Sequence, residues 1–156
     1  MKALIFAVIS TLSIASPAFA EVTVNDAWVR ATPGSTKITA AYATILNSGT
    51  ADDVLTGIRT AIAGMAHLHS STGKDGVMRM ESIETLPVPA GKGVALTPGN
   101  YHVMIMDLKA PLKVGDEIPI IFTFENQGDV SVTAIVMPLN YSGASSDSGA
   151  DHHSHN

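Results

Sequence analysis

The chain has 156 residues, a formal net charge of −5 and no cysteine. It carries only nine Lys and Arg residues, which argues against nucleic acid as a partner because phosphate binding needs a basic patch. The lack of cysteine excludes a disulfide framework, thiolate metal sites, cysteine nucleophiles and the cysteine-ligated blue-copper centre. The length suits one domain, whose fold must be held together by core packing alone.

The first twenty residues have the features of an export signal. Lys2 precedes an apolar run from Ala3 to about Ile14, and Ala18-Phe19-Ala20 has the A-x-A pattern of signal peptidase cleavage. The run is too short to cross a bilayer core of about 30 Å as a helix. We therefore expect residues 1–20 to be cleaved, leaving an exported protein that begins at Glu21, with no stable membrane insertion.

Short strand-like runs follow one another through the rest of the chain, each bounded by Gly, Pro, Asn or Asp. Many of them alternate apolar and polar residues, as expected for strands with one buried face. No window of helical length carries a convincing 3.6-residue period. The sequence therefore predicts an all-β sandwich or barrel. In chain order, strands are expected at residues 22–29, 38–46, 54–59, 66–71, 77–83, 93–96, 101–108, 117–124 and 130–137.

Turn residues and the chain end complete this outline. Pro98-Gly99 fits the central pair of a type II turn, because proline presets φ and glycine accepts a positive φ. Residues 125–129 are predicted to be the loop of the last hairpin. Residues 21–140 are expected to form the single domain, and residues 141–156, with almost no apolar content, a disordered tail.

Histidine and methionine are concentrated between Met65 and Met106. After the signal segment, the only other methionine is Met137, and the remaining three histidines lie in the last five residues. A single methionine is ordinary core filler, so the joint pattern is what indicates a site. The stretch holds His67, His69, His102, Met65, Met78, Met80, Met104 and Met106.

Strand pairing predicts which of these residues can meet. If residues 66–83 form a hairpin in which Thr72 pairs with Val77, His69 directly faces Met80 on the same face. Alternation along the next strand places His102 and Met104 on one face. Provided that the two elements touch, His69, Met80, His102 and Met104 form one metal site. Met65, Met78 and Met106 are then interpreted as packing residues around it. His67 is either a spare ligand or an exposed strand residue, and we favour the latter.

The ligand types select the metal. Thioethers are soft, neutral donors that favour Cu(I), and imidazole suits copper in either oxidation state. A set of two His and two Met carries no ligand charge, which fits a monovalent ion better than Cu(II) or Zn(II). Zinc would instead recruit Cys, Asp or Glu. The sequence therefore predicts a Cu(I) site.

These residues resemble the PCuAC-type periplasmic copper chaperones. The spacing from His69 to Met80, and on to His102-Val103-Met104, matches the H-x10-M-x21-H-x-M signature of that family. The run from Asp26 to Arg30 is similar to its first strand, and Leu96 to Leu108 to its L-x-P-G-x-Y-H-x-M-x-M-x-L segment. The resemblance covers residues 21–138.

The resemblance implies a cupredoxin-like Greek-key β-sandwich that binds Cu(I) near its surface through those two His and two Met. It implies delivery of copper toward the CuA centre of cytochrome c oxidase, alongside a Sco-type thiol protein. We expect the exported protein to be periplasmic and monomeric. Some members carry a Cu(II)-binding tail, and here His152, His153 and His155 offer a candidate Cu(II) site. A merely solubilising tail is the alternative.

Other functions stay open at this point. One is an extracytoplasmic copper storage or resistance protein. Another is an electron-transfer cupredoxin, although the missing cysteine argues against it. A third is a structural or adhesion module. Catalysis has little support, because Asp52-Asp53 are expected in a loop and no Ser/His/Asp spacing indicates a nucleophile. We therefore expect a protein that is not an enzyme.

Overall fold

The computed structural model describes residues 21–74 and 77–143, and this part of the chain is all-β, without a helix. Every strand expected from the sequence is present, with bounds shifted at some ends. The ten strands are β1 (Val22–Arg30), β2 (Ile38–Asn47), β3 (Asp53–Arg59), β4 (Ala63–Lys74), β5 (Val77–Ser82), β6 (Leu86–Val88), β7 (Gly93–Leu96), β8 (Tyr101–Leu108), β9 (Glu117–Phe124) and β10 (Gly128–Met137).

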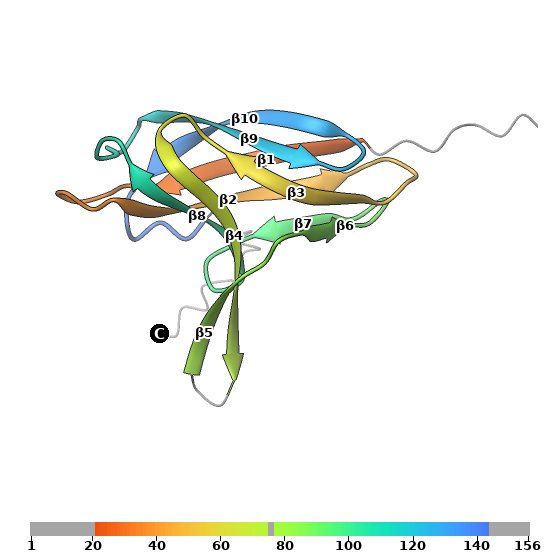
Figure 1. Ribbon diagram of the computed structural model, residues 1–156, viewed down its shortest axis with the longest axis horizontal. Coiled ribbons are helices and arrows are strands. Elements are labelled where there is room, and N and C mark those ends of the chain that lie inside the picture. The colour runs from red at the N-terminus through yellow and green to blue at the C-terminus, as the bar shows by residue number, and fades with distance from the viewer. Residues whose placement is uncertain (1–20, 75–76, 144–156) are drawn as a thin grey trace, which may run out of the picture.

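The strands form one continuous hydrogen-bonded system that folds over a single core. Their order is β5-β4-β8-β2-β1-β10-β9-β3-β6, with β7 paired on β2. β1 and β10 run parallel, and the other neighbours are antiparallel. Figure 1 shows the body of the sandwich, from which the outer parts of β4 and β5 project as an arm. Buried side chains from most strands fill the core, among them Ile45, Leu55, Ile105, Phe122 and Val136.

Strand β6 is the element that the sequence did not predict. It has only three residues, and its central residue is Pro87, which lacks a backbone N–H. β6 lies at the end of the strand order and pairs with β3 alone, and an edge strand tolerates proline. Leu86 and Val88 on either side are buried, so the strand closes one margin of the core.

The turn predicted at Pro98-Gly99 is present. The Asn100 N–H donates to the Thr97 carbonyl over 3.0 Å, and Gly99 has φ of +82°. Both features are those of a type II turn, in which glycine supplies the positive φ. This turn sets where β8 begins, and therefore where His102 lies.

The predicted register of the β4–β5 hairpin is wrong by two residues. Met80 pairs with Ser71, and His69 pairs with Ser82, so His69 and Met80 are not directly opposite. Pairing continues outward to Lys74 and Val77, which leaves Asp75-Gly76 between the strands instead of the four residues expected. Residues 75–76 lie outside the described part of the chain, and Asp-Gly is a pair that two-residue hairpin connections favour.

Asp53 also departs from the expectation of a loop acid. It begins β3 and is almost completely buried. Its carboxylate accepts hydrogen bonds from the backbone N–H groups of Val54, Asn126 and Gln127, at 2.7, 2.9 and 2.8 Å. The side chain therefore ties the β9–β10 loop to the start of β3. A buried carboxylate with this many donors has a structural role.

The Arg59–Asp129 pair makes the free energy of unfolding depend on pH in the acid range. Arg59 and Thr123 both donate to the Asp129 carboxylate, and the Arg59 hydrogen bond is the main cause that lowers the pKa of Asp129 below its ordinary 3.8. Its stabilising contribution is therefore present above pH 3.8 and lost as the pH falls through the lowered pKa. In denaturant titrations, we expect Asp129→Asn to be slightly less stable than wild type at neutral pH, because exposed pairs contribute little. The difference should shrink below pH 3.8; a constant difference down to pH 2 would contradict this.

Candidate metal centre

The two ligand-bearing elements touch, because β4 and β8 are neighbouring antiparallel strands. His69 lies directly opposite His102, and the centroids of their rings are 5.9 Å apart. His67 lies opposite Met104 in the same ladder. The condition on which the predicted site depended is therefore met: three of the four predicted ligands stand on two hydrogen-bonded strands.

These side chains occupy the outer face of the sheet. Leu68 and Val103, which alternate with them along β4 and β8, are buried in the core. Because side chains two apart project to the same side, the histidines and methionines project away from the core. Leu68 and Val103 thus anchor β4 and β8 in the core, and the candidate ligands lie on the opposite face of the sheet.

His102 is held in one orientation by the turn before it. It is 4% exposed, and its Nδ1 lies 3.0 Å from the Asn100 carbonyl oxygen. A carbonyl can only accept, so Nδ1 carries the proton and Nε2 keeps its lone pair. Nε2 is buried and has no hydrogen-bond partner. A backbone carbonyl that fixes the tautomer and aims the second nitrogen is the usual support for a metal-binding histidine.

His69 presents a second nitrogen without a partner. It is partly buried, and its Nδ1 is enclosed with no hydrogen bond. Burial is the largest cause that lowers the pKa of His69 below 6.5, followed by the neighbouring His102 and then His67. Each of these causes disfavours a second positive charge in this place. His69 therefore favours the neutral imidazole, the form in which histidine binds a metal.

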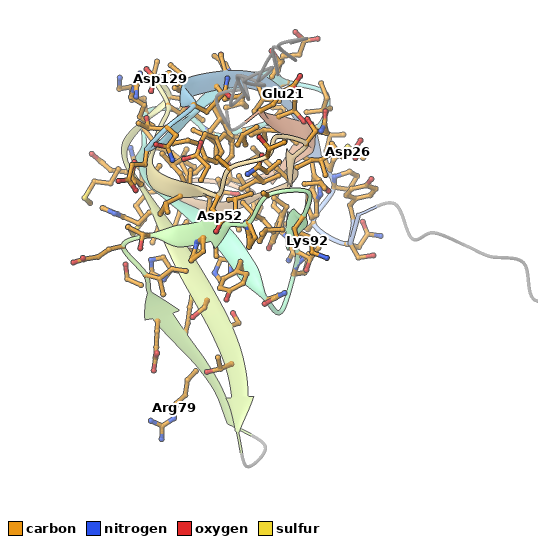
Figure 2. All side chains as sticks on the ribbon, turned by 90° about the vertical axis from the view of Figure 1, so that its right-hand side faces the viewer. Glu21, Asp26, Asp52, Arg79, Lys92 and Asp129 are labelled. Atoms are coloured by element: carbon orange, nitrogen blue, oxygen red, sulfur yellow. The ribbon has the colours of Figure 1, made fainter. Side chains whose placement is uncertain are left out.

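The two candidate methionine ligands, Met104 and Met80, differ in burial and in their position in the fold. Met104 is half-buried on β8, opposite His67 and beside Ala40 of β2. Met80 is 58% exposed on β5, where its partner Ser71 lies two residues from His69 on the same face. Figure 2 shows the neighbouring Arg79 far out on the projecting hairpin, away from the labelled residues of the sandwich. Met80 is thus presented on an arm, while the other three residues lie on the body.

The backbone of Asn100 links the arm to the body. Its carbonyl oxygen accepts the Ser71 N–H over 3.1 Å in addition to the bond from His102 Nδ1. The same atom therefore sets both the orientation of His102 and the position of β4 where the hairpin leaves the sheet. The sequence did not indicate Asn100, because every residue has a backbone carbonyl and the residue type does not show which one accepts a hydrogen bond.

Aromatic side chains continue the outer face beyond His102. Tyr42 of β2 has its ring centroid 6.4 Å from that of His102, and Trp28 of β1 stacks on Tyr42 at 4.2 Å. Burial raises the pKa of Tyr42, and the nearby positive charge of Arg30 partly offsets this. The Tyr42 ring therefore lies next to the His102 ring on the outer face. In the sequence, Trp28 and Tyr42 could have been found as the two large aromatic side chains of the first two strands.

The remaining candidates fall into two groups. Met65 and His67 are exposed, while Met106 is half-buried opposite Met65. His67 is therefore the exposed strand residue that was expected. The side chain of Met78 and the tail residues His152, His153 and His155 lie outside the described residues.

The donor set favours a soft ion. In the described part of the chain, no group of three or more His, Cys, Asp and Glu side chains is placed to share a metal ion. An ion held by His69 and His102 would thus take thioether donors from the methionines beside them. Two imidazoles and thioethers form a neutral set, which suits Cu(I). The protein is therefore a β-sandwich with a candidate soft-metal site on the outer face of β4 and β8.

Comparison with known proteins places the chain in a family. The LpqE-like family model, described as "Putative lipoprotein LpqE-like", matches residues 22–136. Protein Lxx21020 of Leifsonia xyli subsp. xyli, whose name carries the same lipoprotein description, is 33% identical over 125 residues, which are 79% of this chain and 72% of the relative. The chain belongs to the LpqE-like family, that is, to the PCuAC family, as the sequence motifs predicted.

Solved structures confirm the cupredoxin-like β-sandwich. Apo-DR1885 from Deinococcus radiodurans superposes with a TM-score of 0.59 at 30% identity, covering 90% of this chain and 95% of that one. Its Cu(I) form gives a TM-score of 0.55 at 32% identity, with 82% and 83% covered. The apo PCuAC domain of PmoF1 gives 0.63 at 26% identity, with 75% and 93% covered. Relatives of this fold thus include a copper-bound protein.

Proposed function

We propose that this protein binds one Cu(I) ion through His69, Met80, His102 and Met104 and passes it to a partner protein. The observation that carries the proposal is a pair of buried imidazole nitrogens without hydrogen-bond partners, His69 Nδ1 and His102 Nε2, on two residues that lie directly opposite one another on neighbouring strands. Leaving such nitrogens unpaired costs free energy unless something binds them. A copper(I) form of a relative at 32% identity supports copper as the ligand.

The arrangement suits transfer better than storage. The two histidines are preorganised on the body of the sandwich, whereas Met80 is exposed on a projecting hairpin. An acceptor can replace an exposed, neutral thioether without dismantling the domain, because no core side chain has to move. A storage or resistance protein is the second candidate, although the exposed Met80 ligand favours a carrier that releases its ion.

The family supports a specific destination. We infer delivery toward the CuA centre of cytochrome c oxidase in the periplasm, alongside a Sco-type thiol protein, by a monomer with no enzymatic activity. The family is described as lipoprotein-like, but this sequence contains no cysteine whose thiol could accept a lipid. No helix of the described residues is long and apolar enough to cross a membrane. An electron-transfer role is disfavoured, since the Cu–thiolate bond of blue-copper sites needs cysteine.

Copper titration of the full chain under reducing conditions tests the core site. We expect tight binding of Cu(I), with X-ray absorption showing two sulfur and two nitrogen ligands. Because Met→Leu conserves volume, a Met80→Leu/Met104→Leu variant should stay folded and bind the first Cu(I) more weakly, without the two sulfur ligands that Met80 and Met104 supply. A first equivalent of Cu(I) without sulfur ligands would contradict the assignment.

The same titration under oxidising conditions tests the tail. We propose that His152, His153 and His155 hold Cu(II) through nitrogen and oxygen ligands. A second, sulfur-free copper signal should appear only when the sample is oxidised, and should disappear on truncation after Ser142. Copper transfer to an apo CuA domain, followed by the CuA absorption bands, tests the destination separately from binding.

A further inference from the structure

The ladder between β4 and β8 continues past the proposed site with two more pairs of soft donors. Beyond the His69–His102 pair lie His67 opposite Met104 and then Met65 opposite Met106. All of these side chains share the outer face, because each is an even number of residues from His69 or His102. The principal site uses Met104 from this extension and leaves three donors, Met65, His67 and Met106, unassigned.

These three side chains are available to a ligand. Met65 is 51% exposed, His67 is exposed and Met106 is half-buried. Leaving large apolar side chains in water forgoes the free energy of burying them, roughly 1.5–3 kcal/mol for a fully buried methionine. Packing therefore does not explain why Met65, opposite the half-buried Met106, is exposed to solvent.

The register brings the three donors within reach of one ion. Directly opposite residues have Cβ atoms about 4.5–5.5 Å apart, and diagonal ones about 7–8 Å apart, which long side chains can span. Met65 and Met106 form a direct pair, and His67 is diagonal to Met106 and two residues from Met65. Met has three flexible torsions, so both sulfur atoms can turn toward the His67 ring.

The geometry points to a second site for a soft monovalent cation, formed by Met65, His67 and Met106 beside the principal one. Two thioethers and one imidazole are neutral, so Cu(I) or Ag(I) fits and hard divalent ions do not. Met104 lies opposite His67 and belongs to the principal site, so the two sites adjoin. The open surface and the smaller ligand set make this site the weaker of the two.

Ag(I) is the probe, because it is soft, monovalent and not reduced or oxidised during the titration. We expect the methionine methyl NMR signals of Met80 and Met104 to shift with the first equivalent and those of Met65 and Met106 with the second. In Met65→Leu/Met106→Leu, the second event should weaken by at least about tenfold, equivalent to about 1.4 kcal/mol. The first event should be unchanged. Silver held by the tail histidines would move no methionine signal.

Matched variants separate this site from the principal one. Met137→Leu removes a methionine of β10, which β1 and β2 separate from β8 in the strand order, and should titrate as wild type. His102→Phe should weaken the first event and leave the second, so failure of the proposed function would not hide the second site. The inference is overturned if the Met65 and Met106 signals stay fixed through excess Ag(I). It is equally overturned if the Met65→Leu/Met106→Leu variant titrates like wild type.

Discussion

Replacing His102 with phenylalanine is expected to lower the Cu(I) affinity by at least about 100-fold and to leave the domain folded. Loss of a supporting residue behind a metal ligand already costs 10–100-fold in affinity, so loss of a preorganised ligand should cost at least as much. Phenylalanine keeps a flat ring in the buried place beside Tyr42. The Asn100 carbonyl keeps its bond from the Ser71 N–H, so the β4–β8 junction stays satisfied.

The control is the same substitution on the neighbouring exposed histidine. His67→Phe changes the same residue type on the same face, but His67 is exposed and lies opposite Met104 rather than His69. The first equivalent of Cu(I) should bind it nearly as tightly as wild type in competition with a Cu(I) chelator. Thermal unfolding of both apo variants verifies the fold. Equal affinities of the two variants would remove His102 from the site.

Local patterns were sufficient to predict the strands, since alternation and turn residues are properties of short segments. Nine runs were placed within a few residues of their observed bounds, and the Pro98-Gly99 turn was placed correctly. The three-residue strand β6 was missed because it is short and has proline at its centre. Its existence depends on β3 lying alongside, which is information that a local window does not hold.

The hairpin register shows why a correct strand assignment left the contacts wrong. The prediction placed the loop at Gly73–Gly76, although the actual pairing runs on to Lys74 and Val77. A two-residue error preserves the alternation of faces, so His69 and Met80 still share a side while losing their direct pairing. The set of candidate ligands survived for this reason, whereas their geometry changed: Met80 moved outward onto the arm.

The β4–β8 contact and the aim of His102 could not be obtained from local patterns. The two strands are separated by about thirty residues and three other strands, and spacing carries no information about which strands become neighbours. Resemblance to a family supplied the expectation that the two elements meet. The orientation of His102 depends on a backbone carbonyl at the end of a turn, and the three-dimensional structure is needed to place that carbonyl. The His67 and Met65 pairs likewise emerged only with the register.

Asp53→Ala is expected to cause the largest loss of stability of the substitutions considered, about 3 kcal/mol in the free energy of unfolding. The carboxylate accepts three backbone hydrogen bonds, and each bond to a charged group contributes about 1.5–3 kcal/mol. The donors at Asn126 and Gln127 are only partly buried, so water can replace part of what is lost. Guanidinium titration with linear extrapolation measures the change.

Two comparisons separate hydrogen bonding from mere loss of a charge. Asp52→Ala removes the adjacent, exposed carboxylate, which accepts the Ala90 N–H, and should cost less than about 1.5 kcal/mol. Asp53→Asn keeps one acceptor oxygen but points an amide donor at a backbone N–H, so it should lie between wild type and Asp53→Ala. Since the Asp53 carboxylate bonds to Val54 and to the β9–β10 loop, whereas the proposed ligands lie on β4, β5 and β8, all three variants should bind the first Cu(I) like wild type while folded. An Asp53→Ala protein as stable as Asp52→Ala would show that water satisfies the β9–β10 loop, and that this loop does not depend on the side chain.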